Sequence, residues 1–66
     1  MSNQEFVANM RHIIEAMKEK GCDPYTQLTG YVMENESTYI TNHRGARQLI
    51  TTLDIECVKQ FVKEMR

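Results

Sequence analysis

Apolar residues recur every three or four positions along the first third of the chain. Between Asn3 and Lys20 they form a single stripe when placed on a helix, made up of Phe6, Met10, Ile13, Ile14 and Met17. Ser2 or Asn3 can cap the first turn of this helix, and Gly21 suits the left-handed residue that commonly follows the last turn. The pattern therefore predicts a helix over residues 3–20.

A second helix is predicted from Asp23-Pro24 onwards. Aspartate is a good helix cap, and proline at the first helical position gives up an amide that has no helical partner. The apolar stripe that follows ends near Met33 and comprises Tyr25, Leu28, Tyr31 and Val32. Gly30 lies inside this stretch, and two explanations stay open: another helix approaches closely there, or the glycine is simply tolerated.

The second half of the chain predicts two further helices. Residues 35–38 are polar and indicate a turn, and an extra helical turn near 37–40 fits the same stretch, because the β-favouring run 39–41 is too short for a strand. Thr41 or Asn42 can cap a third helix over 43–50, and Asp54 can cap a fourth. The buried positions of these helices are expected to be Ala46, Leu49, Ile50, Ile55, Val58, Phe61, Val62 and Met65. Residues 1–66 are thus predicted to form one all-α domain, a compact bundle of four main helices.

Composition adds that this domain needs a partner. The chain has 66 residues, of which 41% are hydrophobic, and a fold of this size buries only about 60% of the surface of its unfolded chain. We therefore expect that the domain buries part of its remaining apolar surface against a partner. Cys22 and Cys57 form no CxxC pair, and no apolar run reaches the ~20 residues that cross a bilayer, so we expect a cytoplasmic protein without a membrane segment. The net charge of −1 makes nucleic acid an improbable partner.

Residues suited to catalysis or metal binding are few and scattered. The two cysteines, Cys22 and Cys57, have no histidine or aspartate at a spacing typical of a nucleophile and its base. His12 and His43 stand singly, whereas zinc ligands usually occur in close pairs. We accordingly predict no enzymatic activity, no metal site and no cofactor, and a thiol-based sensor remains a minor alternative.

One cluster of cations departs from this background. His43, Arg44 and Arg47 fall in a stretch without any acidic residue, from Ser37 to Leu53, and at the expected start of the third helix. Positive charge is unfavourable at a helix N-terminus unless an anion is present, so these three residues are predicted to bind an anion or a partner. The anion could be an internal carboxylate that fixes helix packing, a phosphopeptide or a nucleic-acid phosphate. A small helical nucleic-acid-binding module that uses Arg44 and Arg47 is therefore the alternative function.

Several segments together resemble the IreB family of small regulatory phosphoproteins from Gram-positive bacteria. They are Lys-Gly-Cys-Asp-Pro at 20–24, Gly-Tyr-Val at 30–32 and Thr-Tyr-Ile-Thr-Asn-His at 38–43, followed by Ala46, Arg47 and Ile50. The resemblance extends from the first predicted helix to the last and is strongest over 39–50. It identifies residues 1–66 as one IreB-like domain.

The resemblance implies a helical homodimer without enzymatic activity that acts through protein–protein interaction. Family members act downstream of a membrane Ser/Thr kinase that monitors cell-wall stress and phosphorylates them, so the implied partner is such a kinase or a regulator downstream of it. The phosphoacceptor threonines of the family precede the first helix, where this chain has Ser2. Ser37 and Thr38, which replace the acidic-proline turn usual before the tyrosine, are the other candidate phosphoacceptors.

Overall fold

Four α-helices and two 3-10 turns account for most of residues 3–65, the part of the chain that the computed structural model describes. In chain order they are α1 (Asn3–Glu19), α2 (Pro24–Glu34), η1 (Ser37–Tyr39), η2 (His43–Gly45), α3 (Ala46–Thr51) and α4 (Ile55–Glu64). No strand occurs within these residues. The all-α prediction is confirmed, including the extra helical turn, which η1 provides.

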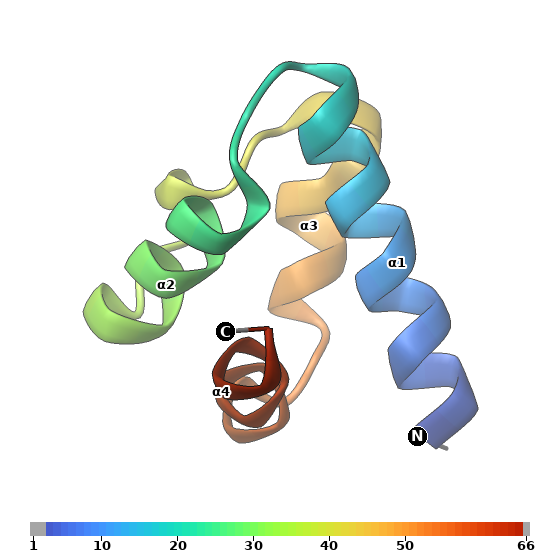
Figure 1. Ribbon diagram of the computed structural model, residues 1–66, viewed down its shortest axis with the longest axis vertical. Helices are drawn as coiled ribbons and strands as arrows, with labels where there is room; N and C mark the ends of the chain where they lie inside the picture. Colours follow the sequence, from blue (N-terminus) through green and yellow to red (C-terminus); the bar gives the residue numbers. More distant parts are fainter. Residues whose placement is uncertain (1–2, 66) are drawn as a thin grey trace.

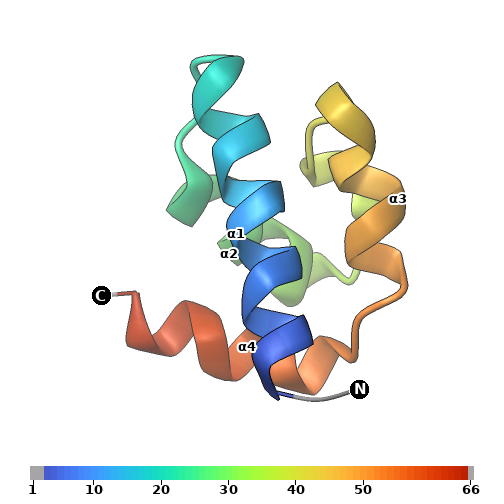
Figure 2. The ribbon, with the colours of Figure 1, turned by 90° about the vertical axis from the view of Figure 1, so that its right-hand side faces the viewer.

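The helices pack as two pairs. α1 lies beside α3, and α2 contacts α4, with η1 placed against α2 and α3 (Figure 1). Seen from the side, α4 crosses below the other helices, near the beginning of α1 (Figure 2). The described part measures 28 × 22 × 21 Å, so its helices enclose a single small interior.

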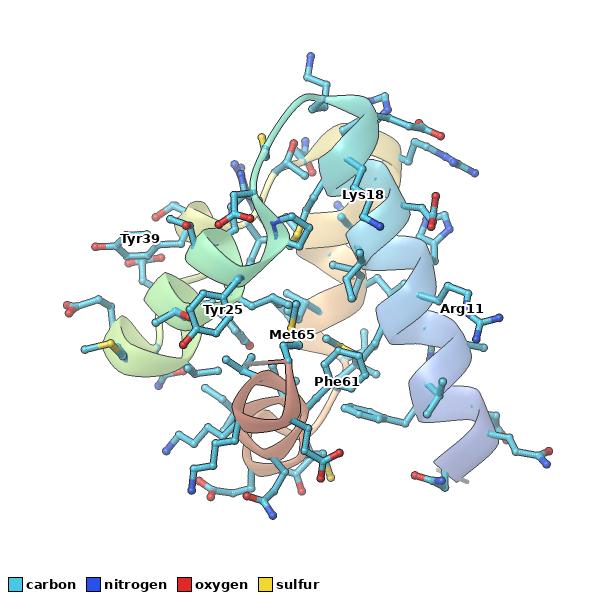
Figure 3. All side chains as sticks on the ribbon, in the orientation of Figure 1. Arg11, Lys18, Tyr25, Tyr39, Phe61 and Met65 are labelled. Carbon is cyan, nitrogen blue, oxygen red and sulfur yellow. The ribbon has the colours of Figure 1, made fainter. Side chains whose placement is uncertain are left out.

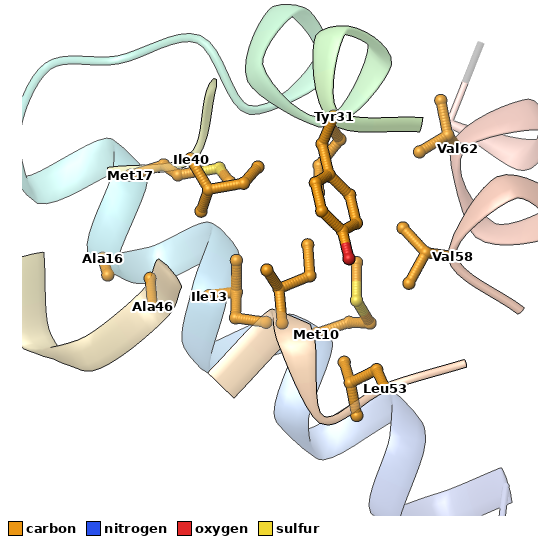
Figure 4. Packing of buried hydrophobic residues seen from close by; sticks show 12 residues of the cluster. Met10, Ile13, Ala16, Met17, Tyr31, Ile40, Ala46, Leu53, Val58 and Val62 are labelled. Carbon is orange, nitrogen blue, oxygen red and sulfur yellow. The ribbon is translucent and has the colours of Figure 1, made fainter. Parts of the chain in front are cut away.

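That interior is almost entirely aliphatic and sulfur-containing. Tyr31 inserts its ring between the α1 and α4 sides, and Ala16 faces Ala46 where α1 and α3 approach each other (Figure 4). Small side chains at this crossing allow the two helices to pack closely. The buried residues are Met10, Ile13, Ala16, Met17, Leu28, Tyr31, Ile40, Ala46, Ile50, Leu53, Val58 and Val62.

Tyr25 is the exception to the predicted stripe of the second helix, because its side chain is 36% exposed. At about 100° per residue, Tyr25 lies about 90° around the helix from the midpoint between Leu28 and Tyr31, the pair that points inward. Figure 3 shows its ring on an outer face of α2. The prediction that Tyr25 packs in the core is therefore wrong.

The helix ends follow the predicted caps. The side chain of Asp23 accepts a hydrogen bond from the Thr26 amide at 3.1 Å, and that of Asp54 accepts one from the Glu56 amide at 2.9 Å. Gly21 adopts a φ of 77° just beyond α1, which is the conformation for which glycine is favoured. The bounds of α1 and α2 lie within one residue of the prediction, and α4 begins directly after its predicted cap, Asp54.

The third helix begins later than predicted, at Ala46 rather than at residue 43. Arg44 and Gly45 both have left-handed backbone, with φ of 55° and 74°, and two such residues in succession interrupt a right-handed helix. Of the two predicted caps, Thr41 bonds to η2 instead: its Oγ1 accepts a hydrogen bond from the His43 amide at 3.2 Å, whereas the Asn42 side chain makes no capping bond. Arg44 has no glycine-like freedom, so its conformation must be held by contacts elsewhere.

Candidate functional site

The contacts that hold Arg44 in its left-handed conformation come largely from the end of α1. His43 Nε2 lies 2.9 Å from Glu19 Oε1, and Arg44 Nη1 donates a hydrogen bond to Glu19 Oε2 at 2.9 Å. Both oxygens of one carboxylate are therefore engaged by η2, across 24 and 25 residues of sequence. We call Glu19, His43 and Arg44 the Glu19 clamp.

The clamp changes the acidity of its carboxyl group. The hydrogen bond from His43 is the largest cause that lowers the pKa of Glu19 below its ordinary value. Desolvation, the next largest, opposes it, and the charge and hydrogen bond of Arg44 then lower the pKa further. The side chains of Glu19 and Arg44 are 48% and 47% exposed, so water and salt screen the pair. The clamp therefore orients η2 more than it stabilises the whole fold.

His12 provides a further link between α1 and the same turn. Its Nε2 lies 3.1 Å from the carbonyl oxygen of Arg44, and because a carbonyl only accepts, Nε2 is the protonated ring nitrogen. Arg44 is thus held at its side chain by Glu19 and at its backbone by His12. A left-handed conformation is unfavourable for a residue other than glycine, and these contacts hold Arg44 in it. This role could not be predicted from the sequence, in which His12 is an isolated histidine on a helix.

Arg47 does not contact the Glu19 clamp and bonds instead to the segment after η1. Its Nε donates a hydrogen bond to the carbonyl oxygen of Ile40 at 2.9 Å, which ties the segment after η1 to the first turn of α3. His43 and Arg44 lie in η2, outside α3, so the expectation that all three cations stand at the start of the third helix is wrong. The carboxylate beside His43 and Arg44 in this structure is the chain's own Glu19. Binding of an external anion or partner by His43, Arg44 and Arg47 stays a prediction.

The candidate phosphoacceptors and thiols lie apart from the clamp. Ser2 falls outside the described residues, whereas Ser37 is half-buried and Thr38 exposed, both in η1. Cys22 is a half-buried free thiol, and Cys57 is an exposed one.

Among residues 3–65, no three histidine, cysteine or acidic side chains gather as metal ligands would. Over the same range, no helix has both the length and the hydropathy needed to cross a bilayer.

An open groove of about 890 Å³ runs between the start of α1 and α4. Its apolar floor is made by Phe6, Val7 and Phe61, and the rings of Phe6 and Phe61 meet edge to face with centroids 6.1 Å apart. Figure 3 shows Phe61 directed from α4 towards α1. The remaining lining residues are polar or small: Asn3, Thr52, Asp54, Glu56, Cys57, Gln60 and Glu64. The sequence pattern placed both phenylalanines in core stripes and did not indicate that they border a groove.

Comparison with known proteins settles the family. The sequence profile of the IreB regulatory phosphoprotein family matches residues 1–65. The chain belongs to the IreB family. The resemblance seen in the sequence is thereby confirmed.

Individual relatives match over a shorter stretch. A UPF0297 protein of Lachnoclostridium phytofermentans is 51% identical over 39 residues, which is 59% of this chain and 44% of the relative. A UPF0297 protein of Ruminiclostridium cellulolyticum is 42% identical over 40 residues, which is 61% of this chain and 46% of the relative. These matches span less than half the length of the curated relatives. No solved structure matches the IreB-family chain.

Proposed function

We propose that this IreB-family protein is a non-catalytic regulator that works as a homodimer and acts by binding other proteins. The observation that carries the proposal is the match to a family of regulatory phosphoproteins over residues 1–65. The partner that fits this family is a Ser/Thr kinase of cell-wall stress signalling, or a regulator downstream of it. The chain would then transmit a phosphorylation signal by changing what it binds.

The surface that best suits a second copy is the groove between α1 and α4. Phe6 and Phe61 pack against the buried cluster, so the groove floor continues the core to the surface. Val7 adds a side chain that is 37% exposed and lies outside that cluster. Because a 66-residue chain hides a modest share of its apolar surface, covering this floor with a partner copy would remove further apolar area from water.

Sedimentation equilibrium of the full chain tests the dimer and its surface together. We expect the wild-type chain to sediment as a dimer at tens of micromolar and Val7→Glu to sediment as a monomer, since a carboxylate in an apolar interface would be buried without a partner. Met33→Glu is the matched control, because Met33 is 74% exposed on α2 and lies outside the groove. It should remain dimeric. A monomeric wild-type chain would refute the dimer, and a dimeric Val7→Glu variant would refute this surface.

A further inference from the structure

We propose that Thr38 is the phosphoacceptor within residues 3–65. The inference rests on the proposed function, since the family match describes phosphoproteins without saying which hydroxyl of this chain is modified. A kinase must place a serine or threonine hydroxyl within hydrogen-bond reach of its catalytic carboxylate. The hydroxyl must therefore be exposed, free of competing bonds, and carried by backbone that can be drawn into the kinase cleft.

Most hydroxyls of the described chain fail one of these requirements. Four of them are engaged in hydrogen bonds, three as donors to a carboxylate or to helix carbonyls and one as an acceptor from a backbone amide. A fifth is buried without a partner. These five residues are Thr26, Thr51, Thr52, Thr41 and Thr29. Two hydroxyls remain, those of Ser37 and Thr38.

Exposure separates the remaining pair. Ser37, at the first position of η1, is half-buried, whereas Thr38, at the middle position, is exposed. The hydroxyl of Thr38 makes no hydrogen bond to any of residues 3–65, and its amide is held weakly, at 3.4 Å from Glu36 Oε1. Thr38 is therefore the hydroxyl that a kinase reaches with the least disturbance of the fold.

The backbone around Thr38 is also the easiest to open. Residues 35–42 contain no α-helix, and the turn itself is closed by two backbone hydrogen bonds, Tyr39 N to Glu36 O at 3.3 Å and Ile40 N to Ser37 O at 2.9 Å. A threonine inside an α-helix could enter an extended cleft only after several cooperative bonds break. Local opening of this 3-10 turn costs far less.

The chemical step needs ATP as the phosphoryl donor and a Ser/Thr protein kinase as the catalyst. The Oγ of Thr38 attacks the γ-phosphorus of ATP, and the bond between that phosphorus and the β–γ bridging oxygen breaks. The proton of the hydroxyl passes to the catalytic carboxylate of the kinase, and ADP leaves with the bridging oxygen. The product is a phosphothreonine with a charge of about −1.5 to −2 at neutral pH.

The new charge would stand in acidic surroundings. Glu34 and Glu36 are close in sequence, and no lysine or arginine occurs from residue 21 to residue 42. Arg47 reaches this segment at the carbonyl of Ile40 rather than at Thr38. Repulsion from the two carboxylates, together with competition for the Thr38 amide, is expected to open η1 and to move Tyr39 away from α2. Phosphorylation would thereby change the α2 face that η1 covers.

Site mapping tests the assignment. The full chain is incubated with Mg-ATP and an extract of its own bacterium, membranes included, and the phosphate is located by tandem mass spectrometry. We expect label on Thr38, loss of that label in Thr38→Ala, and unchanged labelling in Ser37→Ala, the neighbouring control. Absence of label from Thr38 of the wild-type chain, or label on Ser37 that persists in Thr38→Ala, would overturn the assignment.

A second measurement tests the effect on the turn. In two-dimensional NMR spectra, Thr38→Glu should shift the Gly30 amide and the Tyr39 ring signals, whereas the uncharged Thr38→Gln should leave them near their wild-type positions. Equal shifts in both variants would refute opening by charge. The site and the proposed function can fail separately: a dimeric chain that carries no label on Thr38 refutes only the site, and a monomeric chain labelled on Thr38 refutes only the homodimer.

Discussion

Gly30 is a residue whose lack of a side chain is required by a tertiary contact, the approach of the Tyr39 ring. A Cβ atom built on this glycine would lie 2.7 Å from Cδ1 and 3.1 Å from Cγ of Tyr39, closer than side-chain atoms approach each other. Of the two explanations left open by the sequence, close approach is confirmed, but the approaching group is a tyrosine ring from η1 rather than another helix. The ring covers the bare backbone of α2 while remaining 47% exposed itself.

Gly30→Ala is therefore expected to destabilise the protein despite the better helix propensity of alanine. Alanine gains about 1 kcal/mol over glycine inside a helix, while displacing the buried half of the Tyr39 ring from α2 loses roughly 2 kcal/mol of packing, which leaves a net loss of about 1 kcal/mol. Urea denaturation followed by circular dichroism measures the difference. In a Tyr39→Ala background the clash is absent, so the same Gly30→Ala change should become stabilising. Destabilisation in both backgrounds would contradict the argument.

Among the elements, η2 is the one whose shape depends on distant residues. Its backbone turns left-handed at Arg44 and Gly45, and it is attached to α1 by Glu19 and His12 and to the preceding segment by Thr41. The pairing with α1 spans at least 24 residues, so local sequence preferences could not reveal it. A helix that would otherwise begin at residue 43 is thereby delayed to residue 46.

The Glu19 clamp predicts a pH dependence of stability with a defined sign. The pKa of Glu19 is lowered in the folded protein by His43 and Arg44, so the folded state binds fewer protons than the unfolded chain. The contribution of the clamp is complete above the ordinary pKa of 4.5 and is lost as the pH falls through the lowered value. Urea midpoints measured between neutral pH and pH ~3 should fall less steeply for Glu19→Gln than for wild type.

Glu15→Gln is the control for this measurement. Glu15 is exposed on α1, one turn before Glu19, and has no hydrogen bond or ion pair with any of residues 3–65. Its replacement should leave the wild-type slope unchanged. If Glu19→Gln and wild type lose stability in parallel on acidification, the clamp makes no contribution in solution.

For the whole molecule, the sequence predicted what depends on local signals and missed what depends on contacts between elements. The caps at Asp23 and Asp54 and the apolar periods placed α1, α2 and α4, because those signals act within one turn of a helix. The interruption at Arg44, the approach of Tyr39 to Gly30 and the groove beside Phe61 each need a partner from another element. The cation cluster was noticed from its charge, but its internal carboxylate could be identified only in three dimensions.

The proposed homodimer makes the stability of the molecule depend on its concentration. If folded dimers unfold to separate chains, a tenfold increase in protein concentration adds about 1.4 kcal/mol to the free energy of unfolding per dimer, and for two 66-residue chains this raises the Tm by roughly 5 °C. Calorimetry over a hundredfold concentration range should therefore show a steady rise in Tm for the wild-type chain and for Met33→Glu. Val7→Glu, whose carboxylate would stand in the interface, should have a Tm that is low and independent of concentration. A wild-type Tm that does not move across this range would mean that the twelve buried side chains hold one copy folded without help from a second.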